Sequence, residues 1–259
     1  MLRARVELSM DVLTAFWRWE GLDRMPPVLV STVEWLDEQA RREADQRALA
    51  ELAACGLVTA GVVAGELRET IEALTRPEVE FFGWIGGAHQ TVGVLGAACG
   101  REAVLVVRSG QAVTLSSVRP DAVADAVVAQ LPPLAPAQGR SLNVAASDLT
   151  GERAAGGEEG FAGFGQQAEA QDVRALRALL AQPALGGGQL YVAVRGRDGR
   201  RRQSGSPITV RDTAEGRWLT QTTTTSGQRW VITAPGSPQL LMTKLYETWR
   251  VLSDAGDRS

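Results

Sequence analysis

The chain has 259 residues and a net charge of −3, and 44% of its residues are hydrophobic. This apolar content at so low a net charge excludes an intrinsically disordered protein and is enough for one sizeable core or two small ones. It also excludes a general electrostatic attraction to nucleic acid or anionic membranes. The two cysteines, Cys55 and Cys99, are too few for a disulfide framework or a structural metal site, and we expect them to be free, reduced and buried.

The start of the chain does not read as a secretory signal, because Glu7 and Asp11 interrupt the apolar stretch that a signal peptide needs. The longest uncharged run of apolar character, residues 53–65, is too short and too rich in glycine to span a bilayer. We therefore expect a soluble, cytoplasmic protein.

The first half of the chain is expected to contain a strand at 6–9, helical sequence at 11–20 and 31–74, strands over 80–118 and a helix that begins near Pro120. The second half repeats this order, with a strand at 142–145, a helix at 169–180, strands over 190–235 and a helix that begins near Pro238. In the first half, Ser31 and Glu34 have the spacing of a capping box at a helix N-terminus.

An internal repeat is the most informative feature of the sequence. The tripeptide SGQ occurs at 109–111 and again at 226–228, and the flanking strands, turns and closing helices correspond in the same order. The proline-rich stretch 131–140 separates the two copies, because its prolines interrupt helices and strands. We therefore predict an α+β fold in which two structural repeats, 1–135 and 138–259, join in one central antiparallel sheet around a quasi-two-fold axis, flanked by helices.

The sequence contains no recognisable catalytic, cofactor or metal site. His89 is the single histidine and lies in a predicted hairpin turn, with no nucleophile or paired acid near it. The glycine pairs and triplets at 86–87 and 186–188 lack the strand–loop–helix context of a phosphate-binding loop and are typical of turns and linkers. We predict a protein that is not an enzyme and that binds no cofactor and no metal.

Arginine residues crowd the hairpin 195–202 of the second half, together with Asp198. Such a run is typical of a solvated loop that also discourages edge-to-edge strand pairing. The alternative is a contact for an acidic patch on a partner. Nucleic acid is disfavoured as that partner, because the loop has no aromatic side chain to stack on bases.

The strand 220–225 is polar on both faces, whereas its counterpart 103–108 is apolar. Threonine keeps extended geometry while it exposes a hydroxyl group, so such a strand suits an open surface better than a core. The asymmetry between the copies is what we expect if only one half meets a partner. Gln221 and Thr223 are therefore candidate contact residues.

Three tryptophans extend this hypothesis. Trp218 and Trp230 flank the polar strand, and Trp84 lies in the matching strands of the first half. Tryptophan is usually a core residue, but it is also enriched among the residues that dominate binding energy at interfaces. We expect the polar strand and the hairpin 86–91, with Trp84 or Trp218 near them, to form one accessible face.

Five segments stand out together with the order of the elements: DVLTAFWRWEGL, STVEWLDEQ, GLVTAGVVAGELRETIEALTRPEVEFFGWI, CGREAVLVVRSGQAV and GQRWVITAPGSPQLLMTKLYETW. Through these segments and this order, nearly the whole chain resembles the EspG family, the ESX secretion-associated proteins of actinobacteria. The resemblance implies a quasi-two-fold α+β protein with helical bundles that binds the exposed hydrophobic tip of a PPE protein in a PE–PPE heterodimer.

The resemblance also implies where that contact lies. The family uses the loop between the first two meander strands, the sheet and a C-terminal helical bundle. The matching positions here are 86–91, which includes Gly86, Gly87, His89 and Gln90, and roughly 169–182 for the bundle. The loop is shorter than in some relatives, so a WXG100-like or other helical-hairpin substrate is an alternative to a PPE-like partner.

We therefore expect a cytosolic, non-catalytic chaperone of type VII secretion that keeps its substrate soluble. The alternative is a small-molecule enzyme that uses the cleft between the two repeats. Titratable groups crowded in that cleft would favour the enzyme, and an open, polar, groove-like sheet face would favour the chaperone. A structural or DNA-associated module is disfavoured by the acidic balance and the absence of a DNA-binding motif.

Overall fold

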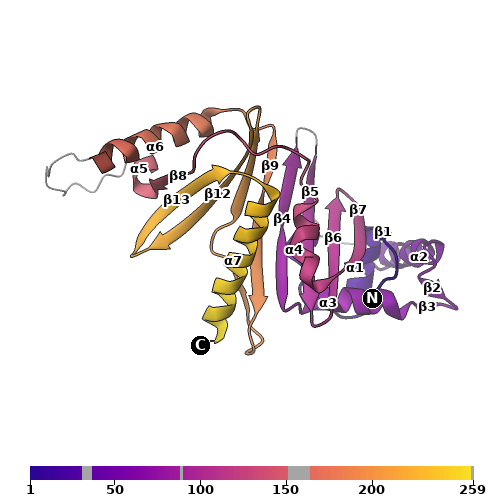
Figure 1. Cartoon of the computed structure of the whole chain (residues 1–259). Helices are drawn as coiled ribbons and strands as arrows, with labels where there is room; N and C mark the ends of the chain where they lie inside the picture. The colour runs from indigo at the N-terminus through magenta and orange to yellow at the C-terminus, as the bar shows by residue number, and fades with distance from the viewer. Residues whose placement is uncertain (31–36, 88–89, 151–163, 258–259) are drawn as a thin grey trace.

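The structure is a computed structural model that describes residues 1–30, 37–87, 90–150 and 164–257. Its centre is an 11-stranded sheet with the strand order β1-β7-β6-β5-β4-β9-β11-β12-β13-β8, in which β10 pairs with β9 as well. The named pairs of neighbouring strands in this sheet are antiparallel. The predicted α+β fold with a large antiparallel sheet is confirmed (Figure 1).

The sheet consists of β1 (Val6–Ser9), β4 (Val79–Gly87), β5 (Thr91–Cys99), β6 (Glu102–Ser109), β7 (Ala112–Val118), β8 (Leu142–Ala145), β9 (Gly186–Arg195), β10 (Arg201–Gln203), β11 (Ile208–Thr213), β12 (Gly216–Thr225) and β13 (Gln228–Pro235). The helices are α1 (Met10–Trp19), α2 (Glu38–Ala54), α3 (Gly65–Thr75), α4 (Val123–Val128), α5 (Ala146–Thr150), α6 (Phe164–Ala181) and α7 (Pro238–Asp257). A separate hairpin joins β2 (Val58–Thr59) to β3 (Val62–Val63), and two 3-10 turns, η1 (Pro27–Leu29) and η2 (Pro120–Ala122), complete the elements.

From one edge to the centre the strand order is β1-β7-β6-β5-β4, and from the other edge it is β8-β13-β12-β11-β9. In both halves the first strand of the half lies at the edge, and the remaining strands follow in reverse chain order to the centre, where β4 pairs with β9. The first SGQ turn joins β6 to β7, and the second joins β12 to β13, which hold corresponding places in this order. Gly110 and Gly227 in these turns have φ of 59° and 80°, a region that glycine enters without a steric cost. This arrangement is what two repeats would produce; the boundaries 1–135 and 138–259 stay a prediction.

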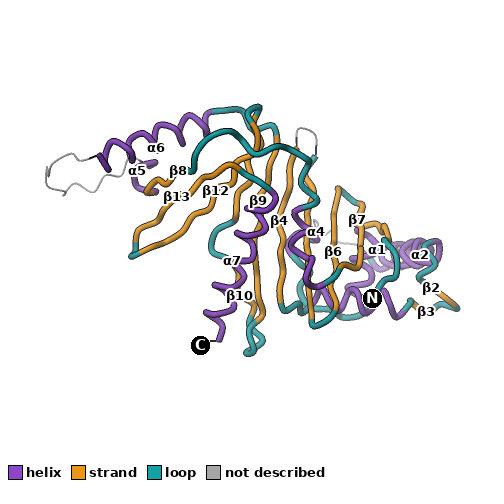
Figure 2. The backbone as a smooth tube through the Cα atoms, in the orientation of Figure 1, coloured by secondary structure: helices purple, strands orange, loops and turns teal. Residues whose placement is uncertain are grey.

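Helices cover parts of both sheet faces (Figure 2). The helices α1 to α3 bury one face of the first half in a core that includes Phe16, Leu95 and Leu115. On the opposite face α4 and α7 pack side by side over a second core that includes Phe81 and Leu245. A third, smaller core lies between α6 and the strands β8, β12 and β13.

The centre of the sheet depends on glycine. A Cβ atom at Gly187 would lie 2.1 Å from the carbonyl oxygen of Val210, and one at Gly83 would lie 1.9 Å from that of Gln189. No side chain fits at these positions, because backbone atoms of the neighbouring strand occupy the space. The expectation that the glycines 186–188 form a turn or linker is therefore wrong: they begin β9 and pair with β4 and β11.

Carboxylates from helices occupy backbone donors at both outer edges of the sheet. At the β1 edge, the Ser9 N–H donates to Oε1 of Glu51 on α2, at 2.6 Å. At the β8 edge, the Asn143 N–H donates to Oδ2 of Asp172 on α6, at 3.1 Å. These donors would otherwise be open to pairing with another strand.

Two other local expectations need correction, and a third cannot be compared with the described residues. The helical sequence predicted over 31–74 is interrupted, because Gly56, Ala60 and Gly61 have positive φ and the β2–β3 hairpin separates α2 from α3. Cys55 and Cys99 are free but exposed, where we expected them to be buried. The capping box at Ser31 and Glu34 lies outside the described residues.

The arginine-rich hairpin is bound largely within the chain. Arg201 donates to both oxygens of Glu80, at 2.7 and 2.8 Å, and its guanidinium lies 5.2 Å from the centre of the Phe82 ring. Arg202 pairs with Asp198 at 2.8 Å. These contacts tie the β9–β10 hairpin to β4 and to itself.

Candidate partner-binding surface

A row of four side chains crosses the middle of the sheet on one face. Trp84 of β4 pairs with Gln189 of β9, Gln189 with Thr209 of β11, and Thr209 with Thr220 of β12. Directly opposite residues in adjacent strands point to the same face, and strands lie about 4.8 Å apart, so the row spans roughly 14 Å. We call these four residues the central row.

The central row lies between two covered parts of the same face. Phe82, two positions before Trp84, is buried against α1 to α3, and Trp218, two positions before Thr220, is buried against α6. The row itself is open: Trp84 and Gln189 are exposed, and the two threonines are half-buried.

A groove of about 870 Å³ adjoins this row, and we call it the central groove. It is lined by Gly86, Gly87, Thr91, Leu180, Ala184, Leu185, Gly186, Gly187, Gly188, Thr209, Val210, Arg211 and Thr220. Two of these side chains, Leu180 and Leu185, are 52% and 57% exposed, which leaves a substantial apolar area on its wall. Arg211 is the single titratable side chain among these described lining residues.

Trp84 is positioned by aromatic neighbours. Its ring meets Tyr191 edge to face, with the centroids 6.5 Å apart, and Tyr191 stacks on Phe82 at 5.6 Å. The indole is 37% exposed, so this stack holds it at the surface with part of its apolar area available to a partner.

The end of the helix α6 contributes Leu180 to the central groove, and the helix is anchored at two places. Near its middle, Asp172 accepts hydrogen bonds from Arg140 and from the Asn143 N–H. At its end, the Arg211 guanidinium donates to the carbonyl oxygens of Leu180 and Gln182. Burial acts to raise the pKa of the Asp172 carboxyl, but these hydrogen bonds and the Arg140 charge outweigh it, so the pKa lies below its ordinary value.

The predicted contact residues do not form a single face. Thr220 belongs to the central row with Trp84, but side chains alternate along a strand, so Gln221 and Thr223 point to the opposite face, toward α7. The side-chain amide nitrogen of Gln221 donates a hydrogen bond to the Thr248 hydroxyl of α7 at 3.4 Å. Thr220 thus lines one groove with Gly86, Gly87 and Thr91, but the expectation that Gln221 and Thr223 share that face is wrong.

The remaining predicted residues are dispersed. Trp218 is 7% exposed, so the expectation that it is accessible to a partner is wrong. Trp230 pairs with Thr223 and lines a separate small cleft beside α5 and α6. Gly86 and Gly87 line the central groove, Gln90 is exposed and donates to the Ser109 hydroxyl, and His89 lies outside the described residues.

The sequence reasoning missed Gln189, Thr209, Arg211 and Leu185. A signal for Gln189 was present, since it is a polar residue between three glycines and the apolar run of residues 190–194. Because the glycines 186–188 were interpreted as a turn or linker, Gln189 was not recognised as part of the sheet surface.

Among the described residues, no three His, Cys, Asp or Glu side chains are grouped as a metal site would require. In the same residues, no helix is long and apolar enough to cross a membrane.

A family model described as the EspG family matches residues 9–247. Among solved structures, the chain is similar to the Mycobacterium tuberculosis type VII secretion system chaperone EspG5, solved in complex with a PE25–PPE41 dimer. The TM-score is 0.69 at 15% sequence identity, and the match covers 94% of this chain and 95% of that one. At this identity the likeness establishes the fold. A search of curated proteins found no match.

Proposed function

Because the chain belongs to the EspG family, we propose that it is a non-catalytic chaperone of type VII secretion that acts in the cytoplasm on a PPE-like protein of a PE–PPE heterodimer. The observation that carries the proposal is the open, partly apolar central row and groove in the middle of the sheet. The solved EspG5 structure, whose fold this chain shares, contains such a heterodimer.

The chemistry of this surface suits the binding of a protein better than the conversion of a small molecule. Catalysis by side chains needs at least one nucleophile, acid or base positioned against a partner. Arg211 is the one titratable side chain in the described lining of the central groove, and its guanidinium already donates to two carbonyl groups of the chain, so the threonine hydroxyls of the lining have no acid or base within that lining to activate them. This supports the chaperone over an enzyme that acts in the cleft between the halves.

The physical role of the chaperone would be to cover an apolar patch. A large exposed apolar patch on a soluble protein promotes aggregation, and covering it keeps the protein in solution. Trp84 would be the anchor, with Leu180 and Leu185 as the apolar wall and Gln189, Thr209 and Thr220 as hydrogen-bonding groups. An interface of the usual size, about 1,600 Å² in total, with a few such anchors gives a stable complex without any nucleotide.

Co-expression tests this proposal directly. PE–PPE pairs from the source genome would be produced one at a time with and without this chain. We expect at least one PPE-like protein to be soluble only with the chain and to co-elute with it at equal stoichiometry in size-exclusion chromatography. If every pair is equally soluble and elutes separately, the chaperone proposal is refuted.

A further inference from the structure

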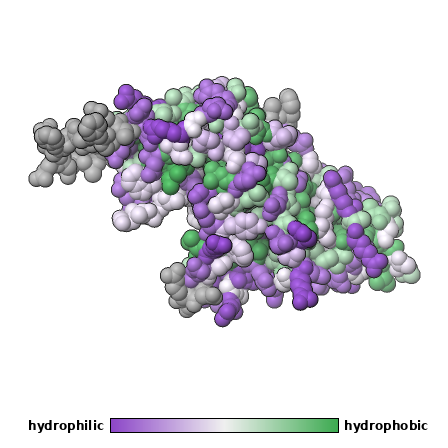
Figure 3. All heavy atoms as spheres, viewed as in Figure 1, coloured by the Kyte–Doolittle hydropathy of each residue, from purple (hydrophilic) through white to green (hydrophobic). Residues whose placement is uncertain are grey.

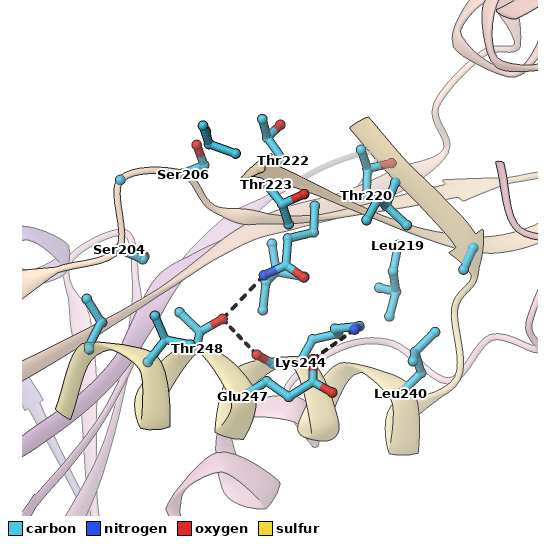
Figure 4. A pocket seen from close by; sticks show the side chains of 18 residues that line it. Ser204, Ser206, Leu219, Thr220, Thr222, Thr223, Leu240, Lys244, Glu247 and Thr248 are labelled. Atoms are coloured by element: carbon cyan, nitrogen blue, oxygen red, sulfur yellow. Dashed lines mark hydrogen bonds and ion pairs between the residues drawn. The ribbon is translucent and has the colours of Figure 1, made fainter. Parts of the chain in front are cut away.

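Two hollows apart from the central groove differ in their charge. The larger, about 580 Å³, lies between β12 and α7 on the opposite face of the sheet, where the surface is hollowed and apolar residues gather (Figure 3). The two charged side chains among its described lining residues, Lys244 and Glu247, form an ion pair at 2.8 Å (Figure 4). This hollow therefore has no unbalanced charge with which to select a ligand.

The smaller hollow has an excess of arginine. It lies where β4 begins and β9 ends, beside the end of α3 and the loop that follows α1, and its volume is about 260 Å³. We call it the arginine pocket. Its charged lining consists of four arginines and two carboxylates, namely Arg24, Arg76, Arg195, Arg201, Asp23 and Glu80.

The register of the sheet places three of these residues on one face. Arg195 of β9 lies directly opposite Arg201 of β10, and Ala193, two positions before Arg195, lies opposite Glu80 of β4. Ala193 belongs to the core that α1 to α3 cover. Because opposite residues in adjacent strands point to the same face, Glu80, Arg195 and Arg201 all lie on the side of these helices.

Two of the arginines are matched by the two carboxylates. Arg201 donates to both oxygens of Glu80, at 2.7 and 2.8 Å. Arg76 pairs with Asp23 at 3.3 Å. The positive charges of the other two arginines, Arg24 and Arg195, are therefore not balanced by the described lining of the pocket.

Arg195 also has an unmet hydrogen bond. Its Nη1 donates to the carbonyl oxygen of Gly199 at 2.8 Å, but its Nε is buried without a hydrogen-bond partner among the described residues. A buried donor without an acceptor is unfavourable, and an acceptor that reaches it recovers that free energy. An anionic oxygen at the Nε–Nη2 edge of Arg195 would supply both the acceptor and the opposite charge.

The loop that carries Arg24 is held in place by the end of α1. The Leu22 N–H donates to the carbonyl oxygen of Trp17 at 3.0 Å, and the indole N–H of Trp17 donates to the carbonyl oxygen of Asp23 at 2.7 Å. The side chain of Arg24 is exposed and forms no ion pair or hydrogen bond with a described residue. Its guanidinium is therefore available to a ligand at a fixed position of the backbone.

We propose that the arginine pocket binds a phosphate group, either as inorganic phosphate or as part of a small phosphate ester. Two guanidinium groups without balancing carboxylates suit a dianion, and the planar guanidinium fork matches the spacing of phosphate oxygens. At about 260 Å³ the pocket is smaller than the usual site for a drug-sized ligand, which favours a small one. It shares no described lining residue with the central groove, so the proposal is independent of the proposed function.

Isothermal titration calorimetry at constant ionic strength tests the site and its ligand. The probes are inorganic phosphate, glycerol 3-phosphate and, as a monoanion, acetate, at a slightly alkaline pH where phosphate is mostly a dianion. We expect one phosphate per chain, bound more tightly than acetate and more weakly as sodium chloride is added. Tighter binding of glycerol 3-phosphate than of phosphate would assign the site to an ester, and the reverse order would assign it to the free ion.

Two variants connect the binding to this pocket. Arg24→Gln and Arg195→Gln should each weaken phosphate binding by about tenfold, because each removes a charge-assisted hydrogen bond. Arg229→Gln is the matched control, since Arg229 is also exposed but lies on β13, outside the pocket, and this variant should bind like the wild type. Circular dichroism melts check folding, and Arg24→Gln alone decides the test if the loss of the Gly199 contact destabilises Arg195→Gln.

Four outcomes would overturn the proposal. These are a wild-type chain that binds no phosphate, acetate that binds as tightly as phosphate, an Arg24→Gln variant with undiminished phosphate binding, and an Arg229→Gln variant that loses as much affinity as Arg24→Gln. None of them would alter the co-expression result for the PPE-like protein, so the two proposals fail separately.

Discussion

Trp84 provides the sharpest test of the central row as the partner-binding surface. Its side chain is 37% exposed. A tryptophan presents about 250 Å², so roughly 90 Å² remains for a partner to cover. At about 25 cal/mol per Å², that burial contributes about 2 kcal/mol, which is roughly a thirtyfold change in Kd. Replacing Trp84 by Ala should therefore weaken binding of the co-purified PPE-like protein by about that factor.

The chain itself offers a matched control. Trp249 on α7 is also 37% exposed and also contacts a tyrosine ring, since its centroid lies 6.1 Å from that of Tyr246, compared with 6.5 Å for Trp84 and Tyr191. The two alanine variants should lose similar stability in thermal melts. Only the Trp84 variant should lose affinity, measured by isothermal titration calorimetry. Equal affinity losses in both variants, or none in Trp84→Ala, would refute the assignment.

Three further predictions concern the scaffold. Because the pKa of Asp172 is lowered on folding, its carboxylate stabilises the fold above the unfolded value of 3.8, and this contribution is lost as the pH falls further. The difference in unfolding free energy between the wild type and Asp172→Asn, measured by urea titrations at a series of pH values, should be largest near neutrality and shrink as the pH falls below 3.8. Arg217 and Asp212 form a buried pair at 2.7 Å, so Arg217→Met should cost about 3–5 kcal/mol in denaturant unfolding, and a double apolar replacement should cost less. Gly187→Val should prevent soluble expression, whereas Gly205→Ala, with nothing within 4 Å of the added atom, should express normally.

The elements with a strong local signal were predictable from the sequence. The SGQ turns place glycine at positive φ between alternating strands, and the stripe of Val173, Leu176 and Leu179 gave a helix that the structure confirms as α6. The interrupted helix near 56–61 was not predicted, because apolar spacing continued across residues whose backbone conformation ends a helix.

The composition of the binding surface depended on information that the sequence does not contain. Trp84 and Thr220 share a face, and Thr223 does not, only because β9 and β11 stand between them in a particular register. A shift of one residue in the register of β9 or β11 would place Thr223, and not Thr220, on the face of Trp84. The burial of Trp218 likewise depends on α6, which is more than 35 residues earlier in the chain and packs on that part of the sheet.

The carboxylates at the two sheet edges determine how this protein can form larger assemblies. A sheet with open edges is a template on which further strands add without limit, whether from other copies or from partly folded clients. Here an incoming strand would first have to displace Glu51 from the Ser9 N–H or Asp172 from the Asn143 N–H. Each of these hydrogen bonds makes the addition of a strand at its edge less favourable. The two edges of the sheet are thus protected by the same kind of contact, one from each half of the chain.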